Sequence, residues 1–323
     1  MLSALDPTWG AARSVAWVVA AQGISGVAKD LTKTASKSAI KATSQQGAGQ
    51  LFRWVAWFTG SKNAMKGFGF FVGGALLQFV GFRPALWLLV WLCWPPPWQA
   101  CCCRCRASSA RPRHRRASKL MAKSRGVNLL AGARIFMFGS RDVWFVVGLP
   151  VFLYSQGWHY VGVSTFLAAW TIGYGGVQAL APSVVRRSED GLSREVPEAR
   201  LWAAALTAIP AAIALLLATG DVGRPDVIVV VGLAVFGFAF AVNSSLHSYL
   251  ILAYAGSEKA AEDVGFYYAA NAGGRLFGIL LSGILTQWGG LQACLWGSAA
   301  MLAACMTLTF MLPLQAQERR IAV

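Results

Sequence analysis

Several cationic side chains lie inside long apolar runs of this sequence, where charged residues are uncommon. Lys62 and Lys66 stand four residues apart in FRWVAWFTGSKNAMKGFGFFVGG, and Arg134 and Arg141 stand seven apart in NLLAGARIFMFGSRDVWFVVGLP. Both spacings place the two side chains on one face of a helix. Arg275 occurs in GFYYAANAGGRLFGILLSG. Because lysine and arginine are the usual ligands of phosphate and carboxylate groups, these five residues could form an anion-binding site.

Polar residues accompany these cations at helical spacing. Tyr268 and Asn271 precede Arg275 by about two turns and one turn of helix, and Asn243 and His247 stand four apart in FAVNSSLHSYL. Residues at such intervals share a helix face. We therefore expect Tyr268, Asn271 and Asn243 to contribute hydrogen bonds to a bound anion.

The runs that contain these residues are long enough to cross a membrane as helices. The 323-residue chain is 56% hydrophobic and 13% charged, whereas soluble proteins are about 25% charged. Runs of about 20 apolar residues fit a hydrocarbon core of about 30 Å, and the short alternating segments of a membrane barrel are absent. We predict an all-α integral membrane protein with nine spans, at about 9–28, 50–80, 82–98, 128–154, 159–182, 201–219, 226–254, 264–287 and 290–313.

The connections between these spans differ in positive charge, which predicts the orientation of the protein. Lysine and arginine concentrate in 29–41, in 99–127, in 183–200 and in the C-terminal tail, and are few in the alternate connections. The positive-inside rule therefore places the N-terminus outside, and the basic connections and the C-terminus in the cytoplasm. Topology also accounts for the net charge of +16, so we expect no nucleic acid as a partner.

Asp142 is the single acid among the intramembrane cations, and its role is open. It could be a structural partner of Arg141 or a carboxylate that couples transport to protons, and His247 is a second candidate for a proton relay. Likewise, Arg275 could simply pair with Asp142, and Lys62 and Arg134 could reach the inner membrane surface. Five cations against one acid are costly in a dry bundle. We therefore expect a water-filled cavity that receives a multivalent anion.

The basic connection 99–127 separates three predicted spans from six. Two six-helix halves around a long cytoplasmic loop are the plan of a major facilitator superfamily transporter. We expect 1–98 to be a partial N-terminal lobe, equivalent to helices 4–6, and 128–323 to be the C-terminal lobe. About nine of twelve helices would then be present, with three missing before Met1. Within the partial lobe, Gly69 and Gly73 form a G-x-x-x-G pattern that predicts close helix approach.

The stretch 95–118, PPPWQACCCRCRASSARPRHRRAS, differs in composition from its surroundings. Three explanations are open: a shifted reading frame in GC-rich DNA, a metal or metalloid site formed by the cysteines at 101–103 and 105, or palmitoylation. Adjacent cysteines converge poorly on one ion, so we expect no metal site. Motifs for cofactors or enzyme nucleophiles are also absent, and we expect no cofactor and no enzymatic activity.

Three segments resemble a particular transporter family. They are QGISGVAKDLTKTASKSAIKA at Gln22–Ala42, FRWVAWFTGSKNAMKGFGFFVGG at Phe52–Gly74, and SRDVWFVVGLPVFLY at Ser140–Tyr154. These segments resemble the organoarsenical-efflux (ArsJ-type) permeases of the major facilitator superfamily. The resemblance covers about 1–94 and 119–323. It does not extend across 95–118, and it lacks the family's first three spans together with the short motif between the second and third.

The resemblance implies secondary-active export of 1-arseno-3-phosphoglycerate across the cell inner membrane, and hence arsenate resistance. In that family a glyceraldehyde-3-phosphate dehydrogenase makes this ester from arsenate, which implies a functional link to such an enzyme. The ester carries an anionic group at each end, in agreement with the excess of cations. Charge alone would equally fit a sugar phosphate or an organic acid. An exporter of another organic phosphate and an inactive truncated fragment are the alternatives.

Overall fold

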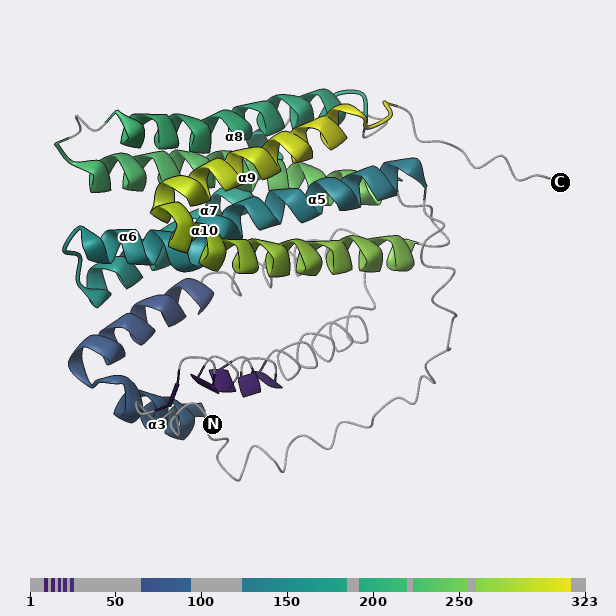
Figure 1. Cartoon of the computed structure of the whole chain (residues 1–323). Coiled ribbons are helices and arrows are strands. Elements are labelled where there is room, and N and C mark those ends of the chain that lie inside the picture. The colour runs from purple at the N-terminus through teal and green to yellow at the C-terminus, as the bar shows by residue number, and fades with distance from the viewer. Residues whose placement is uncertain are drawn as a thin grey trace, which may run out of the picture. The chain divides into compact units, whose positions relative to one another are not determined.

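The computed structural model describes residues 65–93, 124–184, 192–219, 223–254 and 260–314, together with scattered positions between 9 and 25. Every regular element within these residues is a helix. The chain divides into two units, Met1–Ala110 and Arg111–Val323. The helices of both units are drawn in Figure 1. The division falls within the basic connection 99–127 that is predicted to join two lobes.

The described helices of the Met1–Ala110 unit are strongly apolar. Residues 65–79 form one helix, and α3 (Phe82–Cys93) follows it after a turn at Gly81. Large apolar side chains on both helices are exposed, with Phe79 at 77% and Trp91 at 78%. Such surfaces are favourable where lipid chains are the neighbours, because lipid is as apolar as leucine. Both helices lie within the predicted spans 50–80 and 82–98, and the described residues of the first span, 9–28, are also largely helical.

The Arg111–Val323 unit is a bundle of long helices. α5 (Arg125–Val143) continues through a π-helical segment (Trp144–Gly148) into α6 (Leu149–Ser155), and is followed by α7 (Tyr160–Val184), α8 (Glu195–Ala218), α9 (Pro225–Tyr254) and α10 (Ala260–Phe310). Four helical segments in the described residues are long and apolar enough to cross a membrane, namely Arg125–Ser155, Glu195–Ala218, Pro225–Ile251 and Gly265–Phe310. The chain is therefore a multi-pass helical membrane protein.

α10 consists of two rods joined by a sharp turn (Figure 1). The turn lies at Gly289 and Gly290, and Gly290 has a φ of +59°, a conformation that is strained for any residue with a Cβ atom. Thr286 before the turn lies close to Cys294 after it, with 3.3 Å between Oγ1 and Sγ. The two rods correspond to the predicted spans 264–287 and 290–313.

We expect Gly290→Ala to destabilise the protein by about 1–3 kcal/mol, because its φ of 59° and ψ of −151° lie near a backbone region that is essentially confined to glycine. The measurement is denaturant unfolding of the purified protein in detergent micelles. Gly283→Ala is the matched control, since an added Cβ at this helical glycine would meet nothing within 4 Å and alanine favours a helix. Equal changes in the free energy of unfolding for the two substitutions would contradict the positive φ at Gly290.

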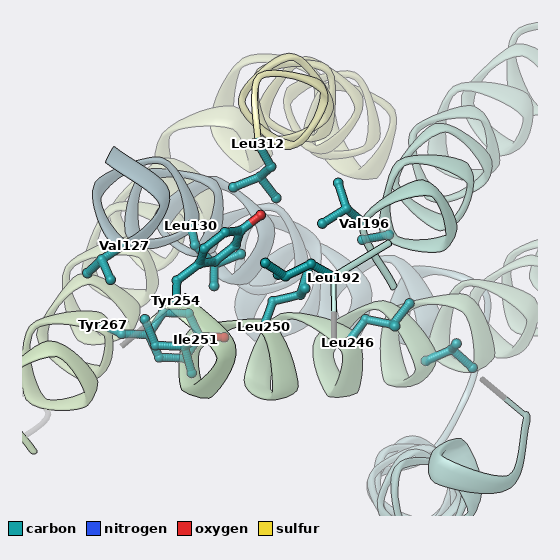
Figure 2. Close-up of a cluster of buried hydrophobic side chains, with 12 residues drawn as sticks. Val127, Leu130, Leu192, Val196, Leu246, Leu250, Ile251, Tyr254, Tyr267 and Leu312 are labelled. Atoms are coloured by element: carbon teal, nitrogen blue, oxygen red, sulfur yellow. The ribbon is translucent and has the colours of Figure 1, made fainter. Parts of the chain in front are cut away.

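Helix ends from several elements meet in one apolar cluster (Figure 2). α5 packs against α9 and α10, α8 packs against the same two helices, and α7 packs against α9. The cluster joins the starts of α5, α8 and α10 to the ends of α9 and α10, so the helices run in alternating directions. Its members are Val127, Leu130, Leu192, Val196, Ala199, Val242, Leu246, Leu250, Ile251, Tyr254, Tyr267 and Leu312.

The backbones of α5 and α10 touch where glycines face each other. An added Cβ at Gly274 would lie 2.2 Å from the carbonyl oxygen of Ile135, and one at Gly278 would lie 2.4 Å from that of Gly139. Gly274 and Gly278 form a G-x-x-x-G pattern, the usual device for close contact between membrane helices. At Gly69 and Gly73, in contrast, an added Cβ would meet no atom within 4 Å in the described part of the chain. The close approach predicted at those two glycines is not seen there.

The π-helical segment Trp144–Gly148 directly follows the charged part of α5. Its wider turn is visible in the hydrogen bond from the Leu149 N–H to the Trp144 carbonyl oxygen, five residues earlier. Pro150 lacks an N–H and cannot continue the α-helical ladder. The Val147 N–H donates to Ser282 Oγ of α10 at 3.2 Å. Because α10 satisfies this backbone group, the π segment is fixed by its neighbour.

Candidate anion site

Most of the predicted site residues belong to the Arg111–Val323 unit and come from three helices. α5 carries Arg134, Arg141 and Asp142, α9 carries Asn243 and His247, and α10 carries Tyr268, Asn271 and Arg275.

The two predicted lysines belong to the Met1–Ala110 unit. Lys66 is exposed on helix 65–79 of the other unit, with Nζ 5.6 Å from the centroid of the Phe70 ring. Lys62 lies outside the described residues. The role of both lysines therefore stays a prediction.

Asp142 lies between two arginines from two helices. Arg141 donates from Nε at 2.8 Å, and also from Nη2, to Oδ1 of Asp142. Arg275 of α10 donates from Nε to Oδ2 at 2.8 Å. The pairing of Arg275 with Asp142, which the sequence leaves open, is thus present. Two guanidiniums share one carboxylate through charge-assisted hydrogen bonds, so this group carries one excess positive charge.

The members of this group differ in exposure. The side chain of Asp142 is 2% exposed and that of Arg141 is 9% exposed, whereas that of Arg275 is 42% exposed. No hydrogen bond joins the terminal nitrogens of Arg275 to another residue of the described chain. Arg275 is therefore the accessible edge of the cluster.

Arg134 is a buried cation held by neutral groups. Its Nε donates to Asn271 Oδ1 at 3.3 Å, and its Nη1 donates to the backbone oxygen and Oγ of Ser244 at 3.2 and 3.1 Å. The rings of Phe138 and Tyr267 flank the guanidinium, with centroids 4.0 and 4.8 Å from Cζ. Within the described ranges no carboxylate lies within 4 Å of it. Aromatic faces and neutral oxygens offset part of the cost of burying this charge, but they do not neutralise it.

Tyr267, which the sequence reasoning does not select, is the tyrosine that contacts Arg134. It is 1% exposed, whereas the predicted Tyr268 is 50% exposed and lies beside it with ring centroids 5.8 Å apart. Adjacent helical residues point about 100° apart, so a spacing of three and a spacing of four from Asn271 both suggest one face. Spacing alone therefore does not choose between Tyr267 and Tyr268.

Asn243 and His247 lie inside the Arg111–Val323 unit, and both are fully buried. Asn243 Nδ2 donates to Met137 Sδ of α5 at 3.5 Å. Three of their buried polar atoms have no hydrogen-bond partner among the described residues. These are Asn243 Oδ1 and both ring nitrogens of His247. Full burial separates this pair from the accessible edge at Arg275. Their predicted parts in anion and proton binding stay predictions.

Arg141 is fixed by aromatic rings as well as by Asp142. Its Cζ lies 5.1 Å from the centroid of Phe138 and 5.6 Å from that of Phe240 on α9. Beyond these rings, Trp144 of the π segment makes edge contacts with Trp170 and Phe236. This packing leaves Arg141 little freedom, whereas Arg275 is held through one nitrogen only.

Comparison with protein-family models, with curated proteins and with solved structures gave no match. The structure itself establishes two guanidiniums paired with one carboxylate, and a third guanidinium, Arg134, held by neutral groups, on membrane helices. In the part of the chain that it describes, no group of three or more histidine, cysteine or acidic residues could hold a metal ion, and the cysteines at 101–105 lie outside that part.

Proposed function

We propose that this protein transports a multivalent organic anion across the cell inner membrane, by secondary-active efflux. The proposed substrate is an ester with an anionic group at each end, 1-arseno-3-phosphoglycerate, and its export would confer arsenate resistance. The observation that carries the proposal is the pairing of Arg141 and Arg275 with one carboxylate, Asp142, on membrane helices α5 and α10. Arg134 of α5 adds a buried cation that is held by neutral groups only.

The charges of this cluster need an explanation that packing does not supply. Arg141, Asp142 and Arg275 together leave one excess positive charge, and the buried Arg134, which no described carboxylate contacts, adds a second. A cation at the centre of a bilayer costs at least about 2.5–3.5 kcal/mol on insertion scales, so a purely structural cluster with this excess would be unfavourable. An anion that enters the lobe compensates the excess, and arginine recognises phosphate-like groups through its planar fork.

The arrangement of the helices supports a transporter lobe. α5 with α6, α7, α8, α9 and the two rods of α10 run in alternating directions, as in the six-helix repeat unit of major facilitator transporters. We propose that Met1–Ala110 belongs to the opposing lobe, that the C-terminus is cytoplasmic, and that the protein acts together with a glyceraldehyde-3-phosphate dehydrogenase. The resemblance of Ser140–Tyr154 to organoarsenical permeases supports this choice of substrate.

Export of another organic phosphate is the second candidate. The side chain of Arg275 is 42% exposed, and its fork would accept a phosphate end as readily as an arsenate end. Transport of radiolabelled 3-phosphoglycerate into inverted membrane vesicles, in the absence of arsenate, tests this candidate directly.

We expect the full chain to confer arsenate resistance on a sensitive host only when the dehydrogenase is co-expressed, because the enzyme supplies the ester. Arg275→Gln should abolish this gain. Arg224→Gln is the matched control, since Arg224 is 75% exposed and pairs with Asp226 away from the cluster, and it should retain resistance at the same membrane abundance. No gain with the wild-type chain, or a gain that is independent of the dehydrogenase, would contradict the proposed substrate.

A further inference from the structure

We infer that Asp142 is a built-in competitor of the substrate anion. Without substrate it occupies Arg275, and when the anion binds, Arg275 exchanges the carboxylate for the anion while Asp142 stays with Arg141. This inference rests on the proposed anion site and adds how that site is held before substrate arrives.

The hydrogen bonds of Asp142 are unequal in a way that permits this exchange. Oδ1 accepts two donors from Arg141, and Oδ2 accepts a single donor, Nε of Arg275. Losing Arg275 therefore costs the carboxylate one hydrogen bond, and Asp142 remains paired. The buried charge of Asp142 is thus never left without a partner, which would be strongly unfavourable.

Exposure indicates which member of the cluster meets the anion. Asp142 and Arg141 are almost fully covered, whereas 42% of the Arg275 side chain is exposed and its terminal nitrogens are unused within the described chain. Two terminal nitrogens in one plane form a fork that fits the oxygens of a phosphate group. Two guanidiniums and one carboxylate carry a net charge of +1, and the first negative charge of a bound anion brings the cluster to zero.

The helix contact around the cluster favours exchange by side-chain rotation. Gly274, next to Arg275, and Gly278 touch the backbone of α5 beside Asp142, at Ile135 and Gly139. With the two backbones in contact, α5 and α10 have little freedom to move apart. The Arg275 side chain, held through Nε alone, is the part that is free to turn toward a ligand.

The test is binding of 3-phosphoglycerate to the full-length protein in lipid nanodiscs, measured by calorimetry. Asp142→Asn removes the competing charge and keeps the shape, so it should bind 3-phosphoglycerate more tightly, on the order of tenfold. Arg275→Gln should lose binding, both alone and combined with Asp142→Asn. Asp226→Asn on α9 is the matched control, because Asp226 accepts hydrogen bonds from Trp158 and Arg224, and it should bind as the wild type does.

The outcomes separate this inference from the proposed function. If the wild type binds and Asp142→Asn binds equally or more weakly, Asp142 is a structural partner only, and the inference is overturned while the anion site stands. If the wild type binds neither 3-phosphoglycerate nor inorganic phosphate, the inference is overturned, and the arsenate-resistance assay decides the proposed substrate separately.

A second measurement covers the case in which Asp142→Asn does not fold. The arginine Nε–H signals of the wild-type protein are recorded by NMR during titration with 3-phosphoglycerate, and Arg275→Lys identifies the Arg275 signal by its loss. We expect that signal to shift in a saturable manner, because its acceptor changes. The Arg134 signal, whose acceptor is Asn271 Oδ1, should stay in place. An unchanged Arg275 signal at saturation would overturn the exchange.

Discussion

Gly274→Ala is expected to prevent stable folding of the helix bundle. An added Cβ at this position would lie 2.2 Å from the Ile135 carbonyl oxygen and 2.7 Å from its carbonyl carbon. These are backbone atoms of a helix, which cannot turn aside as a side chain can. We expect a loss at or above the upper end of the about 1–3 kcal/mol that overpacking usually costs. Denaturant unfolding in detergent micelles, with the yield of folded protein in the membrane fraction, measures it.

The neighbouring Gly273 supplies a matched control. A Cβ added there would meet nothing within 4 Å, and alanine favours the helical conformation over glycine by up to about 1 kcal/mol. Gly273→Ala should therefore be as stable as the wild type or slightly more stable. Gly278→Ala should behave like Gly274→Ala, because its Cβ would lie 2.4 Å from the Gly139 oxygen. If all three variants unfold alike, α5 and α10 do not cross at these glycines.

Asp142→Leu is expected to destabilise the protein by about 3–5 kcal/mol, the usual cost of removing one partner from a buried ion pair. The substitution leaves Arg141 and Arg275 without the carboxylate that accepts from both. The double variant Arg141→Met and Asp142→Leu removes the buried cation as well, and should recover much of this loss because the remaining Arg275 is partly exposed. Unfolding of the two single variants and the double variant completes a thermodynamic cycle.

Asp226→Leu is the control for this cycle. Asp226 also accepts hydrogen bonds from two side chains, Nε1 of Trp158 and Nη2 of Arg224, but it lies in the first turn of α9 and its arginine is largely exposed. Its replacement should therefore matter much less. A double variant that loses as much as the sum of the two single losses would mean that Arg141 and Asp142 do not stabilise each other.

Hydrophobic runs predicted the membrane helices well, because the length and apolarity of a span are physical requirements of the bilayer. The predicted span 226–254 corresponds to α9, Pro225–Tyr254, and the predicted pair 264–287 and 290–313 corresponds to the two rods of α10. α8 begins at Glu195, six residues before the predicted 201. Its first turn contains Glu195 and Glu198, whose charges suit a helix N-terminus but interrupt an apolar run. Hydropathy thus finds the part of a helix in lipid and misses a polar first turn.

The site was harder to predict because its contacts join helices that are distant in sequence. The spacing of Arg134 and Arg141 follows from one helix, whereas Arg275 reaches Asp142 across 133 positions. The pattern permits this pairing without specifying it. The contact of Tyr267 with Arg134 depends on the rotation of α10 about its axis, which a difference of one residue changes by about 100°. Sequence spacing does not determine that rotation, since the glycine contacts with α5 set it.

The π-helical segment lets one long helix face the same neighbour in both of its halves. Gly139 and Gly148 both lie against the first rod of α10, since an added Cβ would be 2.9 Å from Gly274 O in the first case and 3.4 Å from Thr286 Oγ1 in the second. Nine α-helical steps would put these glycines about 180° apart, on opposite sides of the rod. The π turn at Trp144–Gly148 absorbs one residue, so the pair behaves as if separated by eight steps, about 80° apart. The π turn therefore rotates the second half of the span relative to the first. Because of this rotation, the charged half in α5 and the half that follows the π segment both face α10.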